Sequence, residues 1–138
     1  MYPEELIAPM RAELTDVGFK EFRSSEDVEN HLKEHKGTTF IVVNSVCGCA
    51  AGAARPGVRY ALEKSPSKPD ILATVFAGND TGAVAKFREL VLPYPPSSPA
   101  MALFKDGELV HFIERHHIEG RNAQMIGDHL IEVFEHFC

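Results

Sequence analysis

The amino-acid sequence predicts an α/β fold in which helices cover both faces of a central mixed sheet. Residues 38–43 and 71–77 are continuous apolar runs, which is typical of strands buried on both faces of a parallel sheet. A helical segment separates them, as in a strand–helix–strand crossover between parallel strands. Nearer the C-terminus, Asp106-Gly107 lies between the apolar runs 101–104 and 109–113, which predicts a β-hairpin. The hairpin adds antiparallel strands at one edge of the sheet.

Periodicity, caps and turn residues predict the remaining elements in order. Apolar residues at helical spacing indicate a first helix that ends at Gly18. Pro56 falls inside the helix that begins in the alanine-rich run, and we expect it to kink that helix. The predicted elements are helix 4–17, strand 19–22, a helix from Ser24 or Ser25 to Gly37, strand 38–43, a helix from the run 50–54 to about Lys64, strand 71–77, helix 83–92, a proline-rich loop, the hairpin, and a final helix capped by Asn122.

Length and charge exclude several classes of function. The 138 residues fit one domain, residues 1–138, that can bury a core without a metal or disulfides. Lys plus Arg number 14 and Asp plus Glu number 20, so the net charge of −6 argues against binding to a phosphate backbone. No apolar run approaches the roughly 20 residues of a membrane span, and the acidic N-terminal segment is not a signal peptide. We expect a cytoplasmic protein that binds neither nucleic acid nor membrane.

Cys47 and Cys49 flank Gly48 at the turn after strand 38–43, and open α/β sheets place their sites at such carboxyl ends of strands. Cys47 is expected at or just before the first helical turn, where free N–H groups and the helix dipole lower a thiol pKa. Cys49 is close enough to attack a mixed disulfide on Cys47, and Gly48 supplies the freedom that a small, strained ring demands. This pattern indicates redox chemistry or metal binding; the alternative is two cysteines that pack near a helix start.

The run Val46-Cys47-Gly48-Cys49-Ala50-Ala51-Gly52, followed by Ala54-Arg55-Pro56, resembles the signature of the bacilliredoxin family, and the resemblance covers essentially the whole chain. It implies a thioredoxin-like fold with an N-terminal helical extension. It also implies reduction of mixed disulfides between client proteins and the low-molecular-weight thiol bacillithiol, which is a co-substrate, with no other cofactor. Cys47 matches the attacking cysteine and Cys49 the second cysteine of the motif.

Ordinary thioredoxins, by comparison, have two residues between the cysteines, usually with a preceding Trp. This chain has one residue there and no Trp, which favours an intermediate that is a mixed disulfide with a small thiol. Residues 98–108 resemble the thioredoxin segment in which a cis-proline faces the active-site cysteine. The Ser98–Pro99 bond is therefore expected to be cis and to expose the Ser98 backbone to an extended substrate; a trans proline in a stiff loop is the alternative.

Four polar residues surround the motif in sequence. Arg55 is a candidate to hold the carboxylates of bacillithiol, or else it belongs to a solvated helix face. For Arg59 we expect the solvated face, with Glu63 as its partner one turn later. Asn44 and Ser45 are expected to hydrogen-bond the loop or a thiolate, or merely to satisfy turn backbone.

The remaining candidates are Cys138 and the pair His116-His117. Three roles are open for Cys138: a resolving thiol, an intermolecular cross-link or an inert terminus. We expect the last, because chain ends are usually frayed. Zinc needs four convergent ligands, which Cys47, Cys49, a histidine and Cys138 supply only if the tail folds back. We therefore predict no metal site, and place the histidines in a loop or on the surface.

The sequence thus predicts a thiol–disulfide oxidoreductase that reduces protein–bacillithiol mixed disulfides through Cys47 and Cys49, with Gly48, Arg55, Ser98 and Pro99 contacting substrate. Two alternatives remain: a protein disulfide isomerase with the same Cys-Gly-Cys site, and a non-enzymatic protein that senses redox state or metal. The clients are S-bacillithiolated proteins whose identity the sequence does not reveal.

Overall fold

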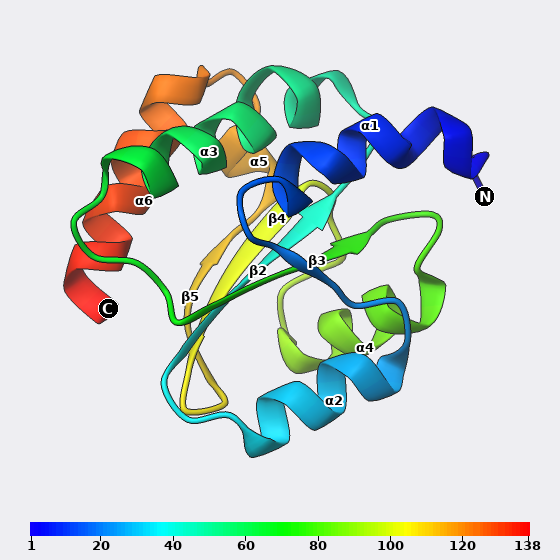
Figure 1. Ribbon diagram of the computed structural model, residues 1–138, viewed down its shortest axis with the longest axis horizontal. Coiled ribbons are helices and arrows are strands. Elements are labelled where there is room, and N and C mark those ends of the chain that lie inside the picture. The colour runs from blue at the N-terminus through cyan, green and yellow to red at the C-terminus, as the bar shows by residue number, and fades with distance from the viewer.

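A mixed five-stranded sheet lies at the centre of the computed structural model, which describes all 138 residues (Figure 1). The strands are β1 (Lys20–Glu21), β2 (Thr38–Asn44), β3 (Ile71–Phe76), β4 (Ala100–Lys105) and β5 (Glu108–Ile113). Their order is β1-β3-β2-β4-β5, so β2 is the middle strand. β1, β3 and β2 are parallel, whereas β4 is antiparallel to β2 and β5 is antiparallel to β4. The α/β class and the mixed sheet predicted from the sequence are confirmed.

Helices cover both faces of this sheet. One layer contains α1, α3, α5 and α6, and the other contains α2 and α4 (Figure 1). None of the helices combines the length and the apolar character needed to span a membrane. The helices are α1 (Glu4–Thr15), α2 (Ser25–Glu34), the π-helical segment η1 (Ala50–Ala54), α3 (Arg55–Lys64), α4 (Thr81–Leu90), α5 (Arg115–Ile118) and α6 (Ala123–Phe137).

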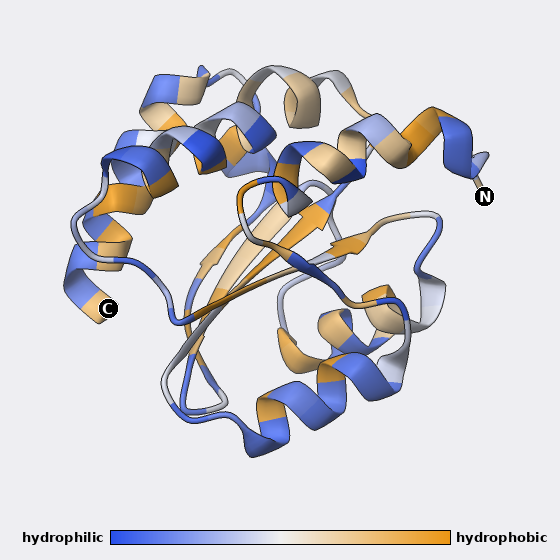
Figure 2. Ribbon diagram, viewed as in Figure 1, coloured by the Kyte–Doolittle hydropathy of each residue, from blue (hydrophilic) through white to orange (hydrophobic).

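The middle strand β2 is buried along its whole length, as its apolar sequence predicts. Successive side chains of a strand point to opposite faces. Phe40 and Val42 accordingly pack against the α1–α3–α6 layer, while Ile41 and Val43 pack against α2 and α4. Figure 2 shows the apolar strands enclosed between helices whose outward surfaces are hydrophilic.

The hairpin and the second helix have the local features that the sequence predicts. Asp106 and Gly107 both have positive φ, 52° and 82°, as in the tight turns that join antiparallel strands. Ser24 caps α2 by accepting a hydrogen bond from the Asp27 N–H, and Asn122 caps α6 by accepting one from the Met125 N–H.

Three local features differ from the prediction. The strand expected over residues 19–22 is paired only at Lys20–Glu21. The segment 115–118 forms a short helix rather than a loop, and no apolar periodicity marks so short a helix. The irregularity expected from Pro56 takes the form of η1, after which Pro56 lies at the start of α3, where its missing N–H is tolerated.

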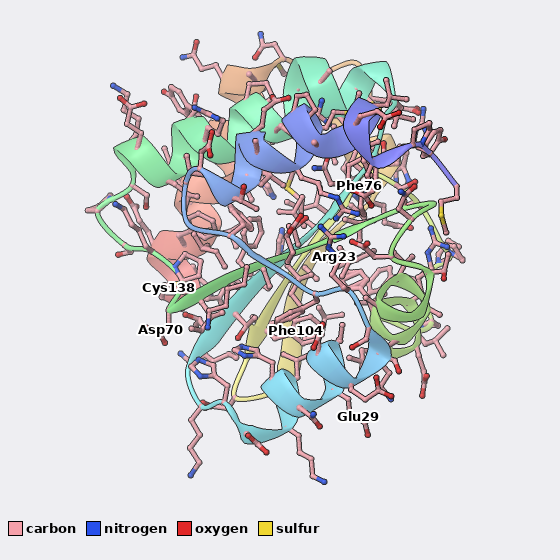
Figure 3. All side chains as sticks on the ribbon, turned by 45° about the vertical axis from the view of Figure 1, so that its right-hand side comes forward. Arg23, Glu29, Asp70, Phe76, Phe104 and Cys138 are labelled. Atoms are coloured by element: carbon pink, nitrogen blue, oxygen red, sulfur yellow. The ribbon has the colours of Figure 1, made fainter.

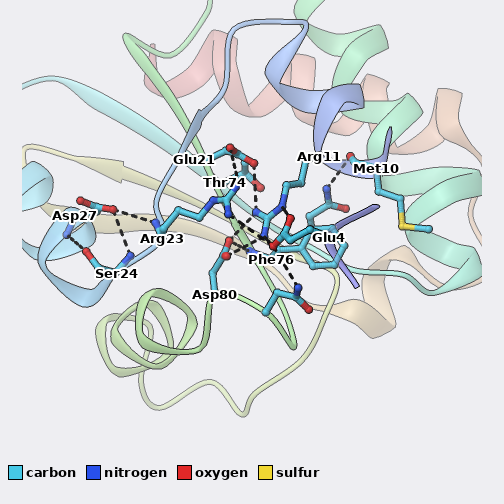
Figure 4. A network of polar contacts seen from close by, with 12 residues as sticks. Glu4, Met10, Arg11, Glu21, Arg23, Ser24, Asp27, Thr74, Phe76 and Asp80 are labelled. Carbon is cyan, nitrogen blue, oxygen red and sulfur yellow. Dashed lines mark hydrogen bonds and ion pairs between the residues drawn. The ribbon is translucent and has the colours of Figure 1, made fainter. Parts of the chain in front are cut away.

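A buried ion pair fixes α1 against the rest of the fold (Figure 4). Both terminal nitrogens of Arg11 donate to the Asp80 carboxylate, at 2.9 Å each, and these residues are only 6% and 5% exposed. Asp80 also accepts the N–H of Phe76, while Glu4 and Glu21 accept further hydrogen bonds from Arg11. The network therefore ties α1 to the turn between β3 and α4.

Candidate active site

The Cys-Gly-Cys motif lies at the carboxyl end of β2, where the chain turns from the sheet into a helix. The Cys47 carbonyl accepts the N–H groups of Ala50 and Ala51, at 3.1 and 3.2 Å, so Cys47 stands at the first helical turn as predicted. Both thiols are half-buried and Gly48 is exposed. Unpaired N–H groups at a helix start favour an anion, and a Cys47 thiolate would occupy that position.

The two sulfur atoms lie side by side. Cys47 Sγ is 2.7 Å from Cys49 Sγ, and both cysteines are free. Burial raises the pKa of Cys47, but hydrogen bonds from Cys49, from Ser45 and from backbone N–H groups outweigh it, so this pKa lies below its ordinary value. Burial and the neighbouring Cys47 thiolate raise the pKa of Cys49. Cys47 is thus the better thiolate and Cys49 its hydrogen-bond donor.

A buried polar cluster shapes the loop that carries Cys47. The Ser45 hydroxyl accepts the Cys47 N–H at 3.2 Å, and Asn44 Oδ1 accepts the Ser45 N–H at 2.9 Å. Asn44 also donates through Nδ2 to the Met10 carbonyl in α1, at 3.0 Å. Asn44 and Ser45 therefore hydrogen-bond the backbone of the loop, and a hydrogen bond from Ser45 to the thiolate stays a prediction.

Arg55 is the largest fully buried side chain of the molecule, 2% exposed, and its expected contact with a small thiol is wrong. One terminal nitrogen donates to Asn44 Oδ1 and to the Ser45 carbonyl, at 2.9 and 2.8 Å. Its Nε lies 3.0 Å from Glu13 Oε2, an ion-pair contact at an angle unsuited to a hydrogen bond. Because Arg55 is buried and its Nη1 and Nε contact protein groups, it supports the active-site loop from within the protein and is not exposed to substrate.

Arg59 lies on an exposed helix face, as expected, but with a different partner, and Gly48 is unstrained in the free-thiol state. Arg59 donates to the Glu13 carbonyl of α1, at 3.0 Å, and forms no ion pair with Glu63. At Gly48, an added Cβ would meet no atom within 4 Å, and the backbone φ is not positive. In the free-thiol state, position 48 does not require a glycine. The role of Gly48 in a disulfide ring or in substrate contact stays a prediction.

Ser98, which precedes Pro99, lies in the same pocket as Cys47. The Ser98–Pro99 peptide bond is cis, as predicted. Ser98, Ser45 and Cys47 line the same pocket, which has a volume of about 310 Å³. The Ser98 carbonyl accepts a hydrogen bond from Arg115 Nη1 at 3.1 Å, whereas its N–H has no partner in the protein.

Three polar side chains of this pocket are not among the site residues predicted from the sequence: Tyr2, Arg88 and Arg115. The positive charge of Arg115 lowers the pKa of Cys49, against the stronger effects that raise it. Strand direction carries a signal that could have identified Arg115. Because β5 runs parallel to β2, the residues that follow each strand meet at the same edge of the sheet. No sequence pattern marks Tyr2 or Arg88.

Cys138 lies at the other end of the sheet from the motif. Its thiol is hydrogen-bonded to Thr38, which begins β2, whereas Cys47 follows the end of that strand. Seven extended residues span about 20 Å. Figure 3 shows Cys138 beside Asp70 at one end of the molecule, with Phe76, the last residue of β3, at the other. Cys138 is therefore not a resolving thiol within the chain, and the four-ligand set that requires it does not assemble.

The histidine pair lies on α5. His116 and His117 are exposed and, with Glu114, bring three ligand atoms within 4.8 Å of one another. His117 Nδ1 accepts the Glu114 N–H at 3.1 Å, so one of its nitrogens already serves the cap of α5. The surface position predicted for these histidines is confirmed.

Comparison with known proteins gives a consistent picture. A family model described as "Disulphide isomerase" matches residues 2–138. A bacilliredoxin of Cytophaga hutchinsonii is 63% identical over 135 residues, covering 98% of both chains. A bacilliredoxin of Geobacillus kaustophilus is 51% identical over 137 residues, covering 99% of this chain and 94% of the relative.

Solved structures identify the fold. A thioredoxin of Fasciola hepatica aligns with a TM-score of 0.61 at 20% identity, over 87% of this chain and all of its own. A Schistosoma mansoni thioredoxin aligns with a TM-score of 0.60 at 17% identity, over 88% of this chain and 97% of its own. The thioredoxin-like fold expected from the sequence is confirmed.

Proposed function

Because this chain belongs to the bacilliredoxin family and is a thiol–disulfide oxidoreductase, we propose that it removes bacillithiol from S-bacillithiolated client proteins, with Cys47 as nucleophile. The relatives are named bacilliredoxins, which supports bacillithiol as the small thiol. The chemistry requires a reducing compartment, and we place it in the cytoplasm.

The reaction has two exchanges. The Cys47 thiolate attacks the bacillithiol sulfur of the mixed disulfide, so that the client–bacillithiol S–S bond breaks and a Cys47–bacillithiol S–S bond forms. The client sulfur leaves as a thiolate and takes up a proton from solvent. The Cys49 thiolate then attacks Cys47 Sγ, which forms a Cys47–Cys49 disulfide and releases bacillithiol as a thiolate; a second molecule of the small thiol can instead clear the adduct.

The observation that carries this proposal is the contrast between the two neighbouring thiols. With their sulfurs 2.7 Å apart, Cys47 has the lowered pKa and Cys49 the raised one. An attacking thiol needs its thiolate at neutral pH, whereas a resolving thiol is needed only after the adduct has formed. Adduct formation uncharges Cys47 and removes the hydrogen bond that keeps the Cys49 proton, so Cys49 then ionises more readily.

The test is intact-mass analysis after mixing the reduced protein with a bacillithiolated client. The wild-type chain should restore the client thiol, and Cys47→Ala should abolish this restoration. Cys49→Ala should complete the first exchange and accumulate one bacillithiol on Cys47. Full activity of Cys47→Ala would show that Cys47 is not the nucleophile.

The description of the matching family model favours disulfide isomerisation as a second candidate function. The same Cys47 thiolate would then attack a wrong disulfide within a folding protein, forming a Cys47–client disulfide and freeing one client thiolate. This thiolate would attack a second client disulfide, and the thiolate released there would attack the client sulfur bound to Cys47 and so regenerate the Cys47 thiolate. Rescue of a scrambled-disulfide protein in the absence of any small thiol would support this function. Client repair that depends on bacillithiol, without such rescue, would exclude it.

A further inference from the structure

The pocket beside Cys47 contains two arginines and no acidic group. Arg88 reaches it from α4 and Arg115 from α5, so the two cations come from different layers of the fold. None of its nine lining residues carries a carboxylate. The whole chain, in contrast, has a net charge of −6, so this pocket differs in sign from the average surface.

Arg88 is half-buried, and none of its guanidinium nitrogens has a hydrogen-bond or ion-pair partner in the protein. Its Nε is buried and donates no hydrogen bond, and the side chain forms no ion pair. A guanidinium that donates to no protein group has its hydrogen-bonding capacity free for another acceptor. The terminal nitrogens of Arg88, which are not enclosed as its Nε is, are therefore available to an anionic ligand in the pocket.

Arg115 is partly engaged and partly free. Its Nε donates to Glu119 at 2.6 Å and its Nη1 to the Ser98 carbonyl at 3.1 Å, which fixes the guanidinium beside the cis-proline loop. Its Nη2 has no protein partner. One edge of this fork is therefore positioned to donate to a ligand next to Cys47.

We propose that Arg88 and Arg115 form an anion subsite that binds the carboxylate-bearing part of the small thiol, and so selects which mixed disulfides Cys47 attacks. The inference rests on the proposed function, because it concerns the same thiol. A volume of about 310 Å³ is at the small end of ligand pockets and fits a small molecule rather than a folded segment. Arginine binds planar carboxylates through paired N–H groups, which a neutral thiol cannot exploit. The carboxylate contact expected of Arg55 is thus assigned to Arg88 and Arg115.

The test compares one client protein carrying either bacillithiol or neutral 2-mercaptoethanol as the mixed disulfide. For Arg88→Gln and Arg115→Gln, kcat/KM with the bacillithiol disulfide should fall at least about tenfold, which corresponds to about 1.4 kcal/mol. The fall with the mercaptoethanol disulfide should be several times smaller. Lys86→Gln is the matched control, since Lys86 also lies on α4 but pairs with Glu89 outside the pocket. Equal losses on both substrates, or no loss on either, would overturn the proposal.

Two further readouts separate this subsite from the proposed function. The rate at which uncharged iodoacetamide alkylates Cys47 reports any change in the thiolate itself. Dividing the kcat/KM of each variant by its alkylation rate corrects for such a change. L-malate, which corresponds to the carboxylate-bearing part of bacillithiol, is the second probe. Its binding to Cys47→Ala, followed by NMR, should be weakened by Arg88→Gln. If the wild-type chain fails to repair bacillithiolated client while malate binding still depends on Arg88, the proposed function falls and the anion subsite stands. Malate binding unaffected by Arg88→Gln would count against the subsite.

Discussion

Removal of the Ser45 hydroxyl should raise the pKa of Cys47 and slow its reactions. The hydroxyl oxygen accepts the Cys47 N–H at 3.2 Å, which leaves the hydroxyl proton free to donate to the thiolate. Ser45 is 6% exposed, so water cannot readily replace the lost donor. Ser45→Ala therefore removes one of the hydrogen bonds that offset the effect of burial on Cys47.

The size of the effect follows from the strength of one hydrogen bond to a charged group, about 1.5–3 kcal/mol. Its loss raises the free energy of the thiolate relative to the thiol by this amount, and so raises the pKa of Cys47. Because Cys47 is only half-buried, solvent screening favours the lower end of the range, about 1.5 kcal/mol. Where the pH lies below the pKa of Cys47, a loss of this size reduces the thiolate about tenfold, but each thiolate becomes about threefold more nucleophilic. The net reaction rate at such a pH should therefore fall about threefold.

The measurement is the pH dependence of thiolate absorbance and of iodoacetamide alkylation. Cys49→Ala and Cys138→Ala form the background, so that only Cys47 titrates and reacts. Ser45→Thr, which keeps a hydroxyl, should retain most of the low pKa. If Ser45→Ala leaves both the pKa and the alkylation rate unchanged, the hydroxyl does not stabilise the thiolate and the reasoning is wrong.

Three further predictions concern stability, each measured by thermal or urea unfolding. Asp80→Asn breaks the buried ion pair with Arg11, so it should cost about 3 kcal/mol of stability, or about 10 °C in melting temperature. The control Glu89→Gln, which breaks an exposed ion pair, should cost under about 1 kcal/mol. Equal losses of stability would contradict a special role for Asp80. Gly57→Ala places a Cβ 2.8 Å from Ile126 and should cost about 1–3 kcal/mol of stability, because α3 and α6 pack closely at this position. In the control Gly52→Ala the new Cβ meets no atom, so its effect on stability should be close to zero. Similar losses for the two variants would argue against close packing between α3 and α6. Burial lowers the pKa of His111 and His129, so the unfolded chain binds their protons more readily. The stability that these two histidines contribute is complete above the ordinary pKa of about 6.5 and is lost as the pH falls through their lower pKa values in the folded protein. His129→Gln should therefore weaken the pH dependence of the unfolding free energy between about pH 7 and pH 5. An unchanged pH dependence would show that the pair does not contribute.

Most of the fold could be predicted because its signals are local. The apolar run of β2, the Asp106-Gly107 turn and the caps of α2 and α6 each specify their element through nearby residues. The position of Cys47 at the helix start follows for the same reason. The prediction fails where the outcome depends on a distant partner: Arg55 is buried because Asn44 and Glu13 converge on it, and nothing in its neighbourhood in sequence specifies that.

The pocket illustrates the same limit. Tyr2 reaches it because its backbone exchanges hydrogen bonds with Asn79, 77 residues away. Arg88 reaches it from the last turn of α4, and no residue near it in sequence links it to the cysteines. Arg115 could have been predicted from the topology. Because β5 runs parallel to β2, the residues that follow these two strands lie at the same end of the sheet.

The dependence of the active-site loop on α1 limits how this site could be transplanted. The Met10 carbonyl accepts a hydrogen bond from Asn44, and Glu13 forms an ion pair with Arg55. Residues near the N-terminus therefore set the shape of a loop more than 30 positions later. A graft of residues 46–52 alone into another thioredoxin-like protein would lack Arg55, which bonds the Ser45 carbonyl, and α1, which bonds Asn44. The portable unit is the loop together with Arg55 and the first helix, and a protein engineer would have to move all three.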